Sequence, residues 1–311
     1  MRNSSATIAA ILVAATAASA QLRGPNAPYN PRDLAATRPI VAAEKAGVAR
    51  ALTGSIDLHL HLAPMDPERP IDVIDAAKLA KSMGMRGILI TSHYEPTAAI
   101  AYIVRKAVPG LEVFGGISFE RATGGLNTAA IEQMLRDKGG YGRLVEFPTF
   151  DTAWRKQPEN MPFVPVSRNG ELVPEAKQVI AMIAKHNLLM STGHSSPAEV
   201  MLLVREAAKQ GVKNMIVGND ADLSLAQLKE LVKLGAYIEF AKQNEDFPGD
   251  SYAKRVLAVG ADHAILAEVG LSIYPPDLVG QLAASLIRQG ATERDLDVMM
   301  KRNPARVLGL P

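Results

Sequence analysis

The run Ser55-Ile56-Asp57-Leu58-His59-Leu60-His61 alternates apolar and polar residues and ends in His-x-His. Such alternation predicts a β-strand, in which residues i and i+2 point to the same face of the sheet. His59 and His61 are therefore expected to project together, with Asp57 one step behind them. Two neutral imidazoles side by side form half of a metal site. A surface strand that happens to carry two histidines is the competing interpretation.

The pattern that begins with this strand repeats along the chain, because apolar runs of strand length alternate with helical patterns. The expected strands span residues 55–61, 86–92, 112–118, 143–149, 188–194, 214–219, 236–241 and 263–269. This order indicates βα units with parallel pairing. Eight such units fit an α/β fold of the (β/α)8 TIM-barrel type with an N-terminal arm and C-terminal helices. A doubly wound open sheet is the alternative, although no Gly-x-Gly-x-x-Gly follows the first strand.

The N-terminus has the features of a secretory signal peptide over residues 1–20. Arg2 supplies a positive charge, a short apolar stretch follows, and Ala18-Ser19-Ala20 fits the small-residue cleavage rule. We expect cleavage after Ala20, a periplasmic or secreted location, and no membrane span in the mature chain; an uncleaved anchor is the alternative. Residues 21–50 are assigned to an N-terminal arm and residues 51–311 to the barrel.

Composition limits the classes of function. The chain has 311 residues, of which 48% are hydrophobic and 21% charged, so it can bury a sizeable core. The net charge of +2 and the lack of a basic run argue against a nucleic-acid partner. With no cysteine, the chain has neither disulfides nor thiolate ligands. We expect a small-molecule substrate and leave association into a homo-oligomer open.

Polar residues at the ends of the expected strands are the candidate site residues, because the active sites of such barrels form at the C-terminal ends of the strands. Four of the six histidines fall there, which favours a metal or catalytic centre. Glu239 either orients one of these histidines or forms a structural ion pair. The candidates at this rim are His59, His61, His93, Glu146, Asp151, Thr192, His194, Asn219, Asp220, Glu239, Lys242 and Glu268.

Three motifs together resemble the metal-dependent amidohydrolase superfamily. They are Asp57-Leu58-His59-Leu60-His61, the His194 that follows the fifth strand, and the closing Asn303-Pro304-Ala305-Arg306-Val307-Leu308-Gly309-Leu310. The resemblance covers residues 53–310. Within the superfamily the chain is most similar to an amidohydrolase-like branch of largely unassigned function, which Phe114-Gly115-Gly116, Gly124-Gly125-Leu126-Asn127 and Phe147-Pro148-Thr149 fit.

The resemblance implies that His59, His61 and His194 bind a divalent metal, and three departures qualify it. The usual His after strand six is replaced by the run that contains Asn219, and Glu268 stands where Asp is usual. The bridging Lys of two-metal members has no counterpart at strand four. Glu146 is the nearest polar residue there, and its side chain points either into the barrel or toward the helices. One ion is therefore favoured over two.

These residues lead to the hypothesis of an exported hydrolase that cleaves an acyl C–N or C–O bond in an amide, lactone or ester. A divalent ion, zinc by ligand preference, is held by His59, His61, His194 and Glu268, with Glu146 as a bridge if it faces inward. Glu268 transfers the proton of the attacking water, while His93 and Asn219 polarise or position the scissile carbonyl. A metal-dependent decarboxylase and a catalytically weak binding protein are the alternatives.

Overall fold

The computed structural model describes residues 47, 49–65, 69, 71–218, 222–241, 250–267 and 277–311, and at 250 and 277–281 the backbone alone. The expected signal peptide and most of the arm lie outside this part of the chain. So do four of the candidate site residues, Asn219, Asp220, Lys242 and Glu268. The account that follows concerns the second of the chain's two compact units, which begins at residue 38.

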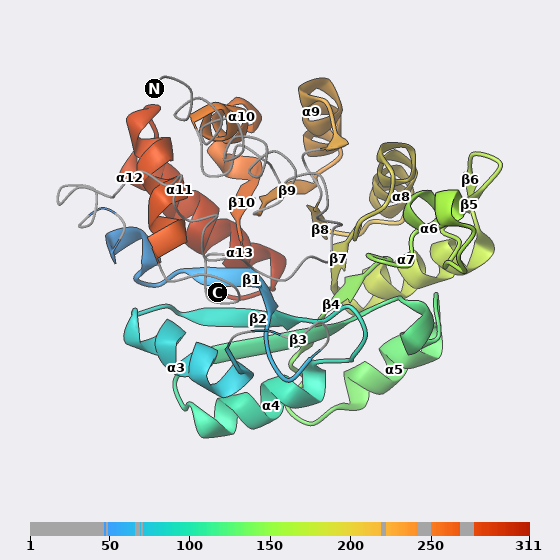
Figure 1. Ribbon diagram of the computed structural model, residues 1–311, viewed down its shortest axis with the longest axis horizontal. Coiled ribbons are helices and arrows are strands. Elements are labelled where there is room, and N and C mark those ends of the chain that lie inside the picture. Colours follow the sequence, from blue (N-terminus) through green and yellow to red (C-terminus); the bar gives the residue numbers. More distant parts are fainter. Residues whose placement is uncertain are drawn as a thin grey trace, which may run out of the picture. The chain divides into compact units, whose positions relative to one another are not determined.

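Eight parallel strands form one sheet in the order β1-β2-β3-β4-β7-β8-β9-β10 and curve into a nearly closed barrel with helices between them (Figure 1). The (β/α)8 prediction is thereby confirmed. The strands are β1 (Ile56–His61), β2 (Gly87–Thr91), β3 (Glu112–Ser118), β4 (Gly142–Glu146), β7 (Leu189–Ser191), β8 (Asn214–Val217), β9 (Tyr237–Phe240) and β10 (Ala264–Leu266). Each lies within the range expected from the sequence or extends it by one residue.

Three of the helices that separate the strands begin at residues whose side chains cap them. Asp72 caps α3, and Ser196 and Ser224 form capping boxes at α8 and α9 with the residue three positions on. The helices are α3 (Val73–Ser82), α4 (Ala98–Ala107), α5 (Thr128–Arg136), α7 (Pro174–His186), α8 (Pro197–Lys209), α9 (Leu225–Lys233), α10 (Asp250–Val259) and α11 (Asp277–Arg288). None of the described helices is both long and apolar enough to cross a membrane.

The long connection after β4 has structure of its own. It contains α6 (Ala153–Lys156), the 3-10 turn η3 (Gln157–Glu159) and a small antiparallel pair, β5 (Ser167–Arg168) with β6 (Glu171–Leu172). Trp154 ties this connection to the loop after β7, since its indole Nε1–H donates to the carbonyl of His194 at 2.6 Å. The only tryptophan thus holds the connection beside a predicted site residue.

The interior of the barrel is filled by one layer of large apolar side chains, with at least one from every strand. They form a buried cluster separate from the larger core that lies between the sheet and the helices. Such filling is what makes a (β/α)8 barrel a packed core rather than a pore. Its members from the strands are Ile56, Leu58, Leu89, Phe114, Leu144, Leu189, Ile216, Tyr237 and Ile265.

A β-bulge in β1 turns the histidines toward the interior. Between Asp57 and Leu60 the strand advances three residues while its partner β2 advances two, from Ile88 to Ile90. One extra residue reverses which face the following side chains occupy. Accordingly Leu58 packs in the interior cluster, whereas Leu60 packs in the outer core. The sequence alternation alone predicted a regular strand, and in this respect the prediction was wrong.

The C-terminal segment closes the barrel at the amino ends of the strands. After α12 (Glu293–Asp297) and the π-helical turn η6 (Val298–Arg302), α13 (Asn303–Val307) packs against β1, β8 and β10 (Figure 1). Ala305, Val307 and Leu308 join the interior cluster. Buried Asn303 fixes this contact, because its Nδ2 donates to the carbonyls of Ala261 and Ala264, each at 2.8 Å.

Replacing Asn303 by Ala is expected to lower the free energy of unfolding by about 2 kcal/mol, because two buried carbonyls lose their donor. Urea denaturation measures this change. Arg302→Ala is the control, since Arg302 is the exposed neighbour in the chain, and it should change the value by no more than about 0.5 kcal/mol. Equal effects of the two substitutions would show that the Asn303 bonds do not anchor the segment.

Candidate active site

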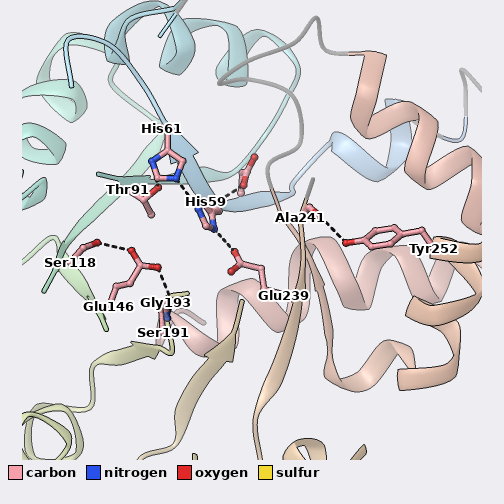
Figure 2. A network of polar contacts seen from close by, with 11 residues as sticks. His59, His61, Thr91, Ser118, Glu146, Ser191, Gly193, Glu239, Ala241 and Tyr252 are labelled. Atoms are coloured by element: carbon pink, nitrogen blue, oxygen red, sulfur yellow. Dashed lines mark hydrogen bonds and ion pairs between the residues drawn. The ribbon is translucent and has the colours of Figure 1, made fainter. Parts of the chain in front are cut away.

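The two histidines of β1 meet at the carboxyl end of the barrel. His59 Nε2 and His61 Nε2 lie 2.9 Å apart, and both side chains are buried (Figure 2). His93, which follows β2, stacks on His61 with ring centroids 4.3 Å apart. His194, which follows β7, lies edge-on to His93 at 5.9 Å. The structure therefore brings together all four histidines that the sequence assigned to this rim.

Glu239 on β9 fixes the orientation of His59. Its Oε1 lies 3.1 Å from His59 Nδ1, and its side chain is almost fully buried. A carboxylate only accepts, so His59 donates from Nδ1 to Glu239. Of the two roles open for Glu239, orientation of a histidine agrees with this contact. The residue pairs with His59 as carboxylates pair with metal-ligating imidazoles in general.

Thr91 lies beside the ring nitrogens of His59 and His61. One ring donates to the other across the 2.9 Å between His59 Nε2 and His61 Nε2. Thr91 Oγ1 lies 3.5 Å from His61 Nδ1. Burial, together with the neighbouring histidines and Arg69, lowers the pKa of His61 well below its ordinary value, so the ring is neutral.

His194 sits on a tight turn that Gly193 makes possible. Gly193 has φ +57°, and a Cβ at this position would collide with the carbonyl oxygens of Phe147 and Pro148. The His194 backbone N–H donates to Pro148 O at 3.0 Å. Its Nδ1 is buried and finds no hydrogen-bond partner among the described residues, and the same holds for Thr192 Oγ1 and Ser195 Oγ beside it. Burial lowers the pKa of His194 well below its ordinary value, and nearby Arg155 adds to this effect.

Glu146 points into the barrel, which settles the direction that the sequence left open (Figure 2). Its carboxylate accepts from Ser118 Oγ at 2.6 Å and from Ser191 Oγ at 3.0 Å. These serines occupy the same register on β3 and β7, the two neighbours of β4. Burial raises the pKa of Glu146, while the charge of His59 and both hydroxyls oppose the rise. Its oxygens are thus held by serines within the polar layer above the apolar interior.

Glu120 is a site residue that sequence reasoning missed. It follows β3, is fully buried, and accepts from the backbone N–H groups of Thr149, Phe150 and Asp151 and from the Thr149 hydroxyl. Burial raises the pKa of Glu120, and these four hydrogen bonds act against the rise. The search for polar strand ends took no residue from the third strand. The rule that active-site residues lie at the C-terminal ends of the strands would have selected Ser118 and Glu120, at and just after the expected strand 112–118.

Thr149 links Glu120 to His93. Its Oγ1 lies 2.7 Å from His93 Nδ1, and it also contacts the carboxylate of Glu120. Burial, together with the charges of His59, Arg69 and Arg155, lowers the pKa of His93 to about 3. His93 is therefore a neutral imidazole at physiological pH, packed between the rings of His61 and Phe150.

The donor set fits a divalent ion only in part. Neutral imidazoles, two nitrogens that face each other, and the unpartnered His194 Nδ1 are what an imidazole-preferring ion such as zinc requires. Within the described ranges, no three His, Asp or Glu side chains already stand in the geometry of a metal site. His59 and His61 thus form half of a site, and Glu268 lies outside the described residues.

The fold and the rim define a (β/α)8 barrel with a buried histidine cluster at the carboxyl ends of its strands. The chain belongs to a family of unknown function, DUF6282, whose model matches residues 54–239. No curated protein matches it.

Solved structures with the same fold include enzymes of several activities. The organophosphorus hydrolase from Deinococcus radiodurans is 17% identical, with a TM-score of 0.56, over 84% of this chain and 94% of that chain. An amidohydrolase from Pseudomonas aeruginosa is 14% identical, with a TM-score of 0.55, over 84% and 97%. The probable dipeptidase PvdM from the same organism is 10% identical, with a TM-score of 0.58, over 90% and 98%. At these identities the likeness establishes the fold.

Gly193→Ala is expected to destabilise the protein by at least about 2 kcal/mol, since it adds a steric collision to the cost of a positive φ. Gly211→Ala is the matched control, because Gly211 has φ +79° and no atom within 4 Å of the added Cβ. It should cost about 1 kcal/mol. Urea denaturation of both variants separates the cost of the steric collision from the cost of the positive φ. Equal losses would mean that the turn before His194 adapts freely.

Proposed function

We propose that this protein is a metal-dependent hydrolase that cleaves an acyl C–N or C–O bond in a small amide, lactone or ester. The observation that carries the proposal is the 2.9 Å approach of His59 Nε2 and His61 Nε2, with Glu239 holding the first ring from behind. Two buried imidazole nitrogens turned toward one another are a pair of ligands that one divalent ion can share. The fold shared with an amidohydrolase and an organophosphorus hydrolase supports the same class.

His59, His61 and His194 are the proposed metal ligands, with Glu268 as the carboxylate ligand. Glu146 is the further carboxylate available to the ion if its serine contacts rearrange. Zinc is the ion that this donor set favours, and one ion is proposed rather than two. A bound divalent ion would lower the pKa of its water to about 7, which would supply a nucleophile at neutral pH.

The remaining steps belong to the chain's own residues. Glu268 is proposed to take the proton of the attacking water and pass it to the leaving group. His93 and Asn219 are proposed to position the acyl group at the rim. Phe150 and the neighbouring imidazoles give the reacting groups a surrounding of low polarity, which strengthens each electrostatic contact. The signal-like residues 1–20 support export of the mature chain.

A binding protein is the second candidate, and one observation favours it. Asn219 and Glu268 replace the His and Asp that the amidohydrolase resemblance leads one to expect. Such a barrel binds a small molecule through its histidines without turning it over. Assay of purified protein against amides, lactones and esters, with detection of released carbon dioxide, separates this candidate from hydrolysis and from decarboxylation.

Purified full-length protein is expected to contain about one equivalent of zinc or manganese. Removal of that ion by a chelator should lower the melting temperature, because an ion that binds only the folded state stabilises it. Elemental analysis and thermal denaturation measure the two effects. A preparation without metal, whose melting temperature added zinc leaves unchanged, contradicts the metal site.

Glu239→Gln is expected to weaken zinc binding by about 10- to 100-fold, because the carboxylate that orients His59 and makes its Nε2 more basic is lost. Competition with a chromophoric chelator measures the affinity. Glu230→Gln is the control, since Glu230 forms only a surface ion pair with Arg205. If the Glu239 variant binds zinc within about threefold of the original protein, its contact with His59 is structural.

A further inference from the structure

Three buried side chains after adjacent strands form a continuous hydrogen-bonded line to His93. Glu120 follows β3, Thr149 follows β4, and His93 follows β2. The Thr149 hydroxyl contacts Glu120 Oε1 on one side and lies 2.7 Å from His93 Nδ1 on the other. All three are at most 3% exposed. The line therefore lies inside the protein, where each proton must have a definite place.

The direction of the line follows from the surroundings of Glu120. Three backbone N–H groups point at its carboxylate, at 3.1 Å from Phe150, at 2.8 Å from Asp151 and from Thr149. A protonated carboxyl would place its own hydrogen among these donors, so the loop fits the ionised form. The Thr149 hydroxyl has one proton and gives it to Glu120. Its oxygen therefore accepts from His93 Nδ1–H.

This direction leaves His93 Nε2 with a lone pair. Among the described residues, Nε2 has no hydrogen-bond partner. His93 also stacks on His61 at an interplanar angle of 24°. A metal lies near the plane of each imidazole that binds it, so two stacked rings do not aim at one ion. His93 thus presents an acceptor beside the proposed ion.

Of the two roles that the sequence suggested for His93, polarising or positioning the carbonyl, an acceptor is compatible only with positioning. Polarising a carbonyl oxygen needs a hydrogen-bond donor, and the single ring proton of neutral His93 is committed to Thr149. The lone pair instead suits an N–H or O–H of the bound molecule. An ester or lactone places an ether-type oxygen, which is itself an acceptor, at the position of the amide N–H. The lone pair of His93 and that oxygen then both lack a donor.

We propose that Glu120 and Thr149 are positioning residues that hold His93 as a hydrogen-bond acceptor for the substrate, so that the site selects amides over esters and lactones. This rests on the proposed hydrolase function and narrows it to one substrate class. Sites built to bond a substrate N–H or O–H discriminate strongly against analogues that lack it, because the buried partner is left unpaired. The carboxylate–hydroxyl–imidazole line sets that partner in place before the substrate arrives.

The first test reads the His93 tautomer directly by nitrogen-15 NMR of the histidine rings in metal-free, full-length protein, with His93→Gln used for assignment. The expected spectrum shows the Nδ1–H form. Thr149→Val should convert it to a mixture of tautomers, and Thr149→Ser should preserve it. An Nε2–H form in the original protein, or no change in Thr149→Val, overturns the proposal.

Thr152→Val is the matched control. Thr152 is equally buried, but its hydroxyl has no hydrogen-bond partner in the part of the chain that the structure describes. It should leave the His93 signals unchanged, and circular dichroism checks that each variant is folded. If Thr149→Val does not fold, Thr149→Ala takes its place with the same expectation. These readouts need no turnover, so absence of hydrolysis does not affect them.

The second test concerns the substrate class and uses p-nitroanilides and p-nitrophenyl esters that share an acyl group. The ratio of kcat/KM for the anilide to kcat/KM for the ester should fall at least about 10-fold in Thr149→Val and stay unchanged in Thr149→Ser. An unchanged ratio in Thr149→Val overturns the selectivity. If neither compound is cleaved, the proposed hydrolase fails. Titration then decides the selectivity, since the anilide should shift the His93 Nε2 signal and the ester should not.

Discussion

The one-residue register shift in β1 is the constraint on which the site depends. In a barrel buried on both faces, a regular strand directs alternate side chains either into the interior or toward the helices. β1 must place Ile56 and Leu58 in the interior layer and also bring His59 and His61 to its rim. Simple alternation cannot satisfy both. The bulge does, and Asp57 stabilises it by accepting from the His59 N–H at 3.0 Å.

Above the apolar interior lies a polar layer in which the described groups support one another. Glu239 holds His59, and the serines of β3 and β7 hold Glu146. Desolvation in this layer keeps His61, His93 and His194 neutral and so leaves each of these rings a lone pair for a metal ion or a hydrogen-bond donor. A buried polar layer of this kind costs stability unless its partners are satisfied, which is the reason that such layers mark functional ends of barrels.

The loops above this layer are tied to one another rather than free. Glu120 gathers the loop after β4, Trp154 joins that loop to the carbonyl of His194, and Gly193 allows the close approach to Phe147 and Pro148. The histidines of the rim are therefore placed by three neighbouring loops acting together. Preorganisation of this kind is what binding and catalysis both require. It agrees with a hydrolase or a binding protein built on the barrel of a family of unknown function.

The sequence by itself determined the eight strands, the helices between them and the rim on which His59, His61, His93 and His194 gather. It could do so because the spacing of apolar residues indicates which positions are buried. In addition, parallel βα units place the carboxyl ends of all strands at the same end of the barrel. Only the tertiary structure decided the bulge in β1, the inward direction of Glu146 and the Glu120–Thr149–His93 line. Each of these features depends on which residues of different strands face one another in the barrel. A local sequence pattern gives no information on those contacts.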